Sequence, residues 1–368
     1  MRLSELKTGQ SATILNVLGH GGFRRRIMEM GFVRGKRVDV LQNAPLRDPI
    51  KYRIMDYEVS LRRSEAAMIV VITAEEVQQQ LSVAGGTLSA PDDADFEEAI
   101  STRSRTINVA LIGNPNSGKT SLFNAISGGH EHVGNYSGVT VDAKRGEYRY
   151  GGYRFVITDL PGTYALSAYT PEELYVRRHL VNDTPDVVVN AVVASNLERN
   201  LYLTTELIDI DPKMVVALNM YDELEASGAV LDYEHLGAML GVPMVPVVAK
   251  TGRGLETLLD TVIAVYENRD PRVRHIHINN GPVVEQALRP LYERLRSDRD
   301  ELPKHFPPRY FAMKLLERDK EVEAQLADCP HFAEWIALRD RAVPQVEEEL
   351  GEDVETALAN QKYGFISG

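Results

Sequence analysis

The residues with the strongest chemical signal form an eight-residue loop, GNPNSGKT, at 113–120. It matches G-x-x-x-x-G-K-[ST], follows the apolar run INVALI and precedes the helix-like KTSLFNAIS, the context that this motif requires. Its glycines allow backbone N–H groups to surround a β-phosphate at a helix N-terminus. Lys119 is expected to reach the β- and γ-phosphates, and the Thr120 hydroxyl to bind Mg²⁺. The motif predicts nucleotide contacts from Gly113, Asn114, Pro115, Asn116, Ser117, Gly118, Lys119, Thr120 and Ser121.

A second element, DLPG at 159–162, follows the strand-like RFVIT. A DxxG tetrad combined with a phosphate loop is typical of GTPases, so Asp159 is predicted at the magnesium ion and Gly162 at the γ-phosphate. Many such enzymes continue with a glutamine that orients the attacking water. Here the next residue is Thr163, which has no amide and a short side chain. Another group must therefore do the work of that glutamine.

Two further loops predict guanine recognition. NMYD, at 219–222, ends the strand-like KMVVALN and matches NxxD. Asp222 can accept hydrogen bonds from N1–H and the exocyclic amine of guanine, a donor pair that adenine lacks. In VVAKTGRG, the N–H of Ala249 is placed to meet guanine O6. The predicted base-side residues are Asn219, Met220 (in place of the usual lysine), Asp222, Val248 (in place of the usual serine), Ala249 and Lys250.

Between the phosphate loop and DLPG lies the Gly-rich segment GNYSGVTVDAKRG. Thr140 is the candidate there to close over the γ-phosphate and complete the Mg²⁺ shell, which gives a catalytic set of Lys119, Thr140 and Gly162. His130 and His132, in the adjacent GGHEHVG, are interpreted as solvated side chains rather than metal ligands. TPEE, at 170–173, is interpreted as a helix start closed by a capping box.

The elements that must position these loops divide the chain into four parts. Residues 106–268 alternate apolar strand-like runs with helical segments, which predicts a mostly parallel sheet covered by helices on both faces. Residues 269–368 show helical periodicity only and are assigned to an all-α domain. Residues 1–75 carry short β-branched runs separated by Gly, Pro and Asp, typical of a small β-barrel. The acidic, polar residues 76–105 read as a linker.

Composition narrows the function classes. No run approaches 18 uninterrupted apolar residues, so no membrane-spanning helix is expected. The single cysteine, Cys329, excludes an internal disulfide and makes no complete metal site with His331; a reducing, cytoplasmic setting follows as the default.

The net charge of −12 argues against nucleic acid as the main partner. Residues 1–74 hold 13 Lys+Arg against 7 Asp+Glu and are net +6, which leaves −18 for the remainder. This charge asymmetry is consistent with docking of residues 1–74 on the rest of the chain or on an anionic surface. It is equally consistent with two independently folded domains whose charges are unrelated.

These motifs carry a resemblance to a known family. GNPNSGKTSLFN, VGNYSGVTVDAKRGEY, DLPGTYALSAY, NLERNLYLTTEL and ALNMYD together resemble the GTPase domain of the bacterial ferrous iron transport protein B family, FeoB. PRYFAMKLLERDKEVEAQL is similar to the family's helical GDP-dissociation-inhibitor-like domain, and YGFI to the point where its cytosolic part meets the first membrane helix. LSELKTGQ, RRRIMEMGF and YEVSLRRSEA resemble the small SH3-like partner FeoA. The fold class implied is an SH3-like β-barrel, then an α/β P-loop GTPase domain, then an all-α helical domain.

The resemblance implies a GTP-hydrolysing regulatory module on the cytoplasmic face of the bacterial inner membrane, joined to a membrane channel. It also implies Mg²⁺, and K⁺ beside the phosphates in place of the glutamine, with the Asn116 side chain as one ligand. The competing interpretation is that Asn116 only braces the loop. Intramolecular docking of the SH3-like domain on the GTPase domain and an oligomer are further expectations. The alternative functions are a ribosome-assembly or tRNA-modification GTPase that binds RNA through residues 1–74, and an interaction module with a vestigial nucleotide site.

Overall fold

The computed structural model describes residues 1–17, 26–43, 48–55, 57–77, 105–128, 131–134, 143–167, 169–303 and 306–367. The chain forms two compact units that divide between Thr106 and Ile107, with the short segment that begins at Pro303 assigned to the first. The GTPase-like and helical parts expected from the sequence therefore lie in one compact unit. The four-part division at 75, 105 and 268 stays a prediction.

The first unit is a small antiparallel sheet. Its described strands are β1 (Ser11–Val17), β2 (Arg37–Asn43), β3 (Ile50–Ile54), β4 (Tyr57–Leu61) and β5 (Ile69–Ile72), in the order β4-β3-β2-β1-β5. A 3₁₀ turn, η1 (Leu3–Glu5), and the short α2 (Arg63–Ala66) accompany it. Alternating burial along β3 places Ile50, Tyr52 and Ile54 in the core, as the period of a half-buried strand requires.

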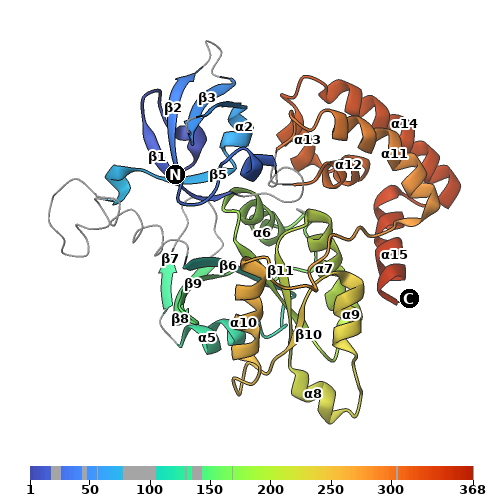
Figure 1. Cartoon of the computed structure of the whole chain (residues 1–368). Coiled ribbons are helices and arrows are strands. Elements are labelled where there is room, and N and C mark those ends of the chain that lie inside the picture. The colour runs from blue at the N-terminus through green and yellow to red at the C-terminus, as the bar shows by residue number, and fades with distance from the viewer. Residues whose placement is uncertain are drawn as a thin grey trace. The chain divides into compact units, whose positions relative to one another are not determined.

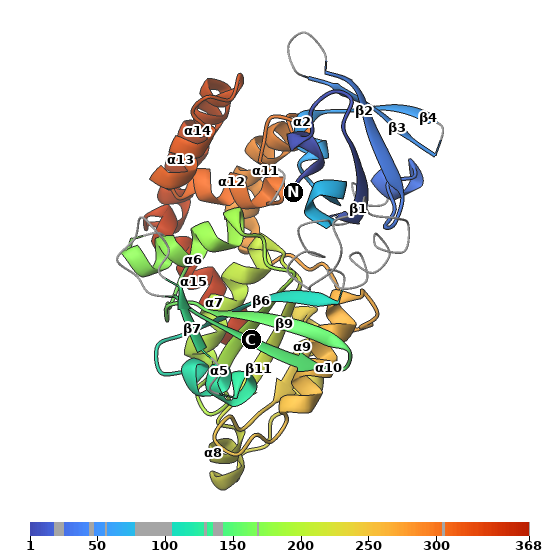
Figure 2. The ribbon, with the colours of Figure 1, turned by 90° about the vertical axis from the view of Figure 1, so that its left-hand side faces the viewer.

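The second unit contains the sheet that carries the predicted motifs (Figures 1 and 2). Among the described residues its order is β12-β11-β10-β6-β9-β8-β7, and β6, β10, β11 and β12 run parallel. The strands are β6 (Thr106–Gly113), β7 (Glu131–Gly134), β8 (Ala143–Tyr150), β9 (Tyr153–Asp159), β10 (Val187–Val193), β11 (Met214–Asn219) and β12 (Met244–Pro246). The carboxyl ends of β6 and β11 bear the phosphate loop and NMYD, and parallel strands bring such ends to one edge.

Helices cover both faces of this sheet. The GTPase-like part contributes α5 (Lys119–Ser127), α6 (Pro171–Asn182), α7 (Leu197–Ile210), α8 (Tyr221–Ala226), α9 (Tyr233–Leu240) and α10 (Leu255–Tyr266). Alternate residues of each central strand enter different cores: Leu111 and Val189 pack with α5 and α10, whereas Ile112 and Val188 pack with α6 and α7.

The second core continues without a break into the helical part. That part comprises α11 (Gly281–Ser297), α12 (Pro308–Leu316), α13 (Lys320–Leu326), α14 (Phe332–Leu350) and α15 (Val354–Ser367). Its buried Phe311 and Trp335 belong to the same apolar cluster as the sheet residues Ile112 and Val188. The C-terminal α15, red in Figure 1, lies beside α7. A continuous core makes the helical part a structural continuation of the GTPase-like part.

The predicted fold class is confirmed in each part: a small antiparallel β domain, an α/β domain of the expected order and an all-α region. Within the described residues, no helix combines the length and apolar character needed to cross a bilayer.

Candidate nucleotide site

The phosphate loop connects Gly113, the last residue of β6, to the first turn of α5. Asn116 and Gly118 have positive φ angles of 66° and 75°, a region that glycine and asparagine tolerate best. A Cβ on Gly113 would lie 2.6 Å from the Ala191 carbonyl oxygen, and one on Gly118 would lie 2.3 Å from the Asn219 amide nitrogen. Both motif glycines are therefore required by close contact with the ends of β10 and β11.

Three predicted residues meet at the start of α5. The Lys119 ammonium pairs with the Asp159 carboxylate at the end of β9, and both side chains are buried. The Thr120 hydroxyl donates a hydrogen bond of 3.3 Å to the other Asp159 oxygen. Hydroxyl and carboxylate oxygens are the donors that Mg²⁺ prefers, so this set fits the ion that the motif implies.

Asn219 links the phosphate loop to the base-side loop. Its Nδ2 donates to the Ser117 carbonyl oxygen at 2.9 Å, and its Oδ1 accepts the Ala249 N–H at 3.1 Å. Met220 follows with a φ of 55°, and its methyl carbon lies 3.2 Å from the position of a Cβ on Gly118. Because the Ala249 N–H already bonds to Asn219, the predicted contact with guanine O6 would have to share that hydrogen.

The other base-side residues differ in exposure. The Asp222 carboxylate, in the first turn of α8, is exposed, as is Lys250. Val248 is buried, and its N–H donates to the Arg253 carbonyl oxygen at 2.9 Å, which closes the loop. An exposed carboxylate beside a closed, buried turn can receive the edge of a base from solvent.

Two polar atoms in the phosphate loop are buried without a hydrogen-bond partner among the described residues: Asn114 Oδ1 and Ser117 Oγ. Buried polar groups are normally paired, because leaving one unpaired costs about 1–3 kcal/mol. A Ser117 hydroxyl can donate to a phosphate oxygen, and Asn114 Oδ1 can accept from a water. Asn116 on this loop is exposed, and so are Thr120 and Ser121 in the first turn of α5.

Thr163 stands where many GTPases have the glutamine, and its hydrogen-bonding groups are taken up by the backbone. Its side chain is 3% exposed, and its hydroxyl donates to the Ala165 carbonyl oxygen at 2.6 Å. Its N–H bonds to the Gly113 carbonyl oxygen at 3.1 Å. A Cβ on the preceding Gly162 would lie 3.1 Å from Pro115 Cα. This segment is packed against the phosphate loop, and the Thr163 side chain bonds to the backbone.

A group of five charged residues lies beyond this segment, and we call it the buried charge cluster. The side chains of Glu206, Lys314 and Lys362 are buried, and those of Asp209 and Glu317 are partly buried. Glu206 Oε2 accepts the N–H of Leu166, four residues after Gly162. Glu206 Oε1 lies 3.4 Å from Lys362 Nζ and 4.0 Å from Lys314 Nζ, and Lys362 Nζ lies 3.2 Å from Asp209 Oδ2. The cluster thus joins the segment after DLPG to α7, α12 and α15.

Charges within this cluster stabilise one another. Burial alone raises the pKa of Glu206, but Lys362 and Lys314 outweigh it and hold that pKa below its ordinary value. Burial lowers the pKa of Lys362, and the carboxylates of Asp209 and Glu206 reverse the effect and raise it. The pKa of Lys314 is raised in the same way by Glu317 and Glu206. All three are therefore ionised at neutral pH.

Two further contacts join the same parts. Arg177 of α6 forms a two-pronged pair with Asp319, the N-cap of α13, at 2.6 and 3.2 Å, and both side chains are buried. The Tyr169 hydroxyl donates to Glu355 of α15 at 2.7 Å. The capping box predicted for TPEE is confirmed, with Thr170 and Glu173 as its two members.

Some predicted residues are not among those that the structure describes, and some residues of interest carry no sequence signal. Thr140 and His130 lie outside the described residues, as does the side chain of His132. Sequence reasoning missed the buried charge cluster, because five charged residues scattered over 206–362 carry no motif. It also missed that Asp298 and Glu301 lie beside His331.

Comparisons with known proteins match all three parts of the chain. Residues 107–262 match the family model of ferrous iron transport protein B, residues 1–73 the FeoA domain, and residues 281–368 the FeoB cytosolic helical domain. The chain is 48% identical over 391 residues to the Fe(2+) transport protein A/Fe(2+) transporter FeoB fusion protein of Porphyromonas gingivalis, covering 100% of this chain and 46% of that relative. It is 35% identical over 240 residues to the Fe(2+) transporter FeoB of Staphylococcus aureus, covering 65% of this chain and 35% of that one. This chain thus spans less than half the length of these curated relatives.

Solved structures agree with these matches. NFeoB from S. thermophilus bound to GDP·AlF4⁻ and K⁺ is 37% identical, with a TM-score of 0.61, and the match covers 71% of this chain and 98% of that one. NFeoB from S. thermophilus in an E66A form bound to GMPPNP is 36% identical with the same TM-score.

Proposed function

Because this chain belongs to the ferrous iron transport protein B family, with a FeoA domain ahead of its GTPase domain, we propose that it binds and hydrolyses GTP as the regulatory part of a ferrous iron uptake transporter. One observation carries the proposal: Lys119, Thr120 and Asp159 meet at the phosphate loop. We infer ferrous iron as the transported ion from the names of the relatives, and the geometry of the site supports the nucleotide chemistry.

In this proposal the phosphate loop holds the nucleotide through its backbone and Lys119. Mg²⁺, when bound, would neutralise charge on the β- and γ-phosphates. Thr120, Asp159 and Thr140 are the residues proposed to hold it, and Gly162 would contact the γ-phosphate. Asn219 keeps the base-side loop in register with the phosphate loop, so Asp222 can accept from the guanine edge while Lys119 contacts the phosphates.

A potassium ion fits the remaining requirement. Thr163 is occupied by the backbone, so the charge that develops on the phosphates must be offset elsewhere. Asn116 is exposed at a positive φ on the phosphate loop, and its side-chain oxygen is a donor of the kind that K⁺ accepts. We propose that Asn116 holds this ion.

The nucleotide state would reach the helical part through the buried charge cluster. Glu206 bonds to the backbone at Leu166, and α12 and α15 supply the opposing Lys314 and Lys362. A movement of the DLPG segment would change the surroundings of Glu206 and shift both helices. The helical part would pass this change to the membrane channel at the cytoplasmic face of the inner membrane.

The FeoA domain would act as a regulatory or docking unit. Its positive charge against the negative remainder is compatible with docking within the chain. An oligomer remains part of the proposal. The RNA-binding alternative is not favoured by the family matches.

The test is GTP turnover by the 368-residue chain, with ATP as competitor and Lys119→Ala as the inactive variant. Lys320→Ala, an exposed lysine at the start of α13, is the matched control. We expect GTP hydrolysis that ATP does not inhibit, lost in Lys119→Ala and kept in Lys320→Ala. Hydrolysis that survives Lys119→Ala would contradict the proposed site, and tight, salt-dependent RNA binding by the chain would favour the alternative.

A further inference from the structure

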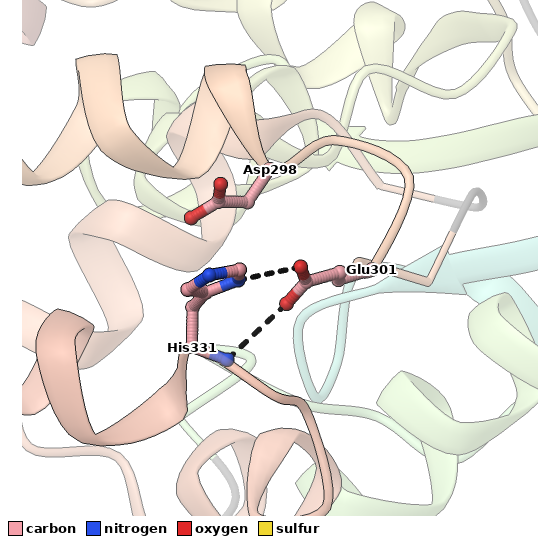
Figure 3. Close-up of side chains that lie close together, drawn as sticks. All are labelled: Asp298, Glu301 and His331. Carbon is pink, nitrogen blue, oxygen red and sulfur yellow. Dashed lines mark hydrogen bonds and ion pairs between the residues drawn. The ribbon is translucent and has the colours of Figure 1, made fainter.

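A second constellation of metal-ligating side chains lies in the helical part, away from the nucleotide motifs. Asp298 is the C-cap of α11, Glu301 lies in the turn that follows, and His331 is the N-cap of α14. One ligand atom from each lies within 4.8 Å of the others, and all three residues are partly buried (Figure 3). We propose that Asp298, Glu301 and His331 bind a divalent transition-metal ion.

Neighbouring groups fix the orientation of Asp298. The indole Nε1 of Trp335 donates to Asp298 Oδ2 at 2.8 Å, and Arg294 Nε lies 3.0 Å from the same oxygen. Trp335 is fully buried, so it holds the carboxylate from the protein interior. Both contacts engage Oδ2, and Figure 3 shows the carboxylate facing the His331 ring. Supporting contacts of this kind orient metal ligands in known sites.

Glu301 and His331 are already in contact. His331 Nδ1 lies 2.6 Å from Glu301 Oε1, and the His331 N–H donates to Glu301 Oε2 at 3.3 Å. An ion that takes nitrogen and oxygen ligands at about 2.0–2.2 Å holds them roughly 3–4 Å apart. Small rotations of the ring and of the Asp298 carboxylate would therefore bring three donors to one ion, with the ion replacing the hydrogen bond between Glu301 and His331.

The donor set selects the class of metal. One imidazole and two carboxylates suit Fe²⁺, Co²⁺, Zn²⁺ and Mn²⁺, whereas Mg²⁺ prefers oxygen ligands and retained waters. The Arg294 guanidinium pairs with both Asp298 and Glu334 at 3.0 Å, so the three carboxylates of Asp298, Glu301 and Glu334 against one cation leave two net negative charges, which attract a metal cation. Three protein ligands also leave positions for water. Such a site suits a metal ion that binds reversibly.

The bound ion would join two helices that are adjacent in space but separated in sequence. It would fasten the end of α11 to the start of α14, which continues toward α15 and Lys362 of the buried charge cluster. The proposal rests on this geometry alone and does not require GTP hydrolysis.

Trp335 provides a direct readout, because it is the only tryptophan in the chain and bonds to Asp298. We would titrate the 368-residue chain with Co²⁺ and, under anaerobic conditions, with Fe²⁺, in the presence of Mg²⁺ and GDP. Tryptophan fluorescence and Co²⁺ absorption are recorded together. The variants are His331→Gln and Glu301→Gln. The matched control is His275→Gln, since His275 pairs with Asp211 at 2.8 Å but does not belong to a group of three possible ligands among the described residues.

We expect a saturable change in Trp335 fluorescence with one Co²⁺ in the wild type and in His275→Gln, and at least tenfold weaker binding in His331→Gln and Glu301→Gln. Circular dichroism checks that the variants fold, and a metal-dependent rise in melting temperature confined to wild type and control gives a second readout. Equal Co²⁺ affinity in all four proteins, or metal binding without any change at Trp335, would overturn the proposal.

Discussion

Lys362 of α15 places its ammonium 3.4 Å from Glu206 Oε1 of α7, although 156 residues separate the two in sequence. Both side chains are almost completely buried, and Glu206 at the same time accepts the N–H of Leu166. The last helix of the chain is therefore tied, through one carboxylate, to the segment that follows DLPG.

Replacing Lys362 by methionine should destabilise the second unit strongly. Removal of one partner of a buried pair leaves an uncompensated charge, which costs about 3–5 kcal/mol. Urea unfolding followed by Trp335 fluorescence measures this loss, and the exposed Lys320→Met serves as control. The double variant Glu206→Gln/Lys362→Met should lose less than the sum of the two single changes. Additive losses would show that the two residues do not interact.

Glu206 should also make stability depend on pH in the acid range. Its folded pKa is below the ordinary value of 4.5, so the ionised form stabilises the fold above pH 4.5. That contribution is lost as the pH falls through the folded pKa. The difference in urea midpoint between wild type and Glu206→Gln should therefore be constant near neutrality and shrink below pH 4.5. A difference that stays constant down to acid unfolding would contradict this assignment.

GTP hydrolysis should be faster in K⁺ than in Na⁺ at equal ionic strength, in single-turnover measurements. Asn116→Gly should abolish that acceleration while keeping the basal rate, because glycine accepts the φ of 66° but offers no side-chain oxygen. Asn116→Ala also removes the side-chain oxygen but strains the backbone at this positive φ, so a lower basal rate in this variant would report on the conformation of the phosphate loop. If K⁺ and Na⁺ give the same rate in the wild type, Asn116 is a brace of the phosphate loop.

Asp222→Asn should lower GDP affinity by roughly 10²-fold and relatively favour xanthosine diphosphate. The carboxylate accepts from two guanine N–H groups, whereas an amide presents one acceptor and a donor that xanthine can meet. Competition against a fluorescent GDP analogue measures both affinities. Glu223→Gln, the exposed neighbour in the same turn of α8, should leave them unchanged.

Local sequence signals were sufficient for much of this structure. GNPNSGKT predicted the turn between β6 and α5, because glycine spacing and the flanking periodicities are local properties. TPEE predicted the start of α6 for the same reason. The sequence predicts a mostly parallel sheet but not the order of its strands, because pairing such as that of Val188 with Met214 depends on contacts between residues distant in sequence.

Long-range charge pairs could not be predicted. Arg177 and Asp319 are 142 residues apart, and each would look like an ordinary surface charge in its own helix. Cys329 and His331 alone make an incomplete metal site, which is all that the local pattern can show. The carboxylates of Asp298 and Glu301 approach His331 only through the packing of α11 against α14.

The contact between Gly118 and Asn219 has a consequence for inheritance and engineering. A Cβ at position 118 would lie 2.3 Å from the Asn219 amide, whose hydrogen bonds also order Ala249. The phosphate loop and the base-recognition loop are thus coupled through direct packing of Gly118 against Asn219. A base loop transplanted from a protein of different nucleotide preference would need the matching phosphate loop, and the two should change together or not at all.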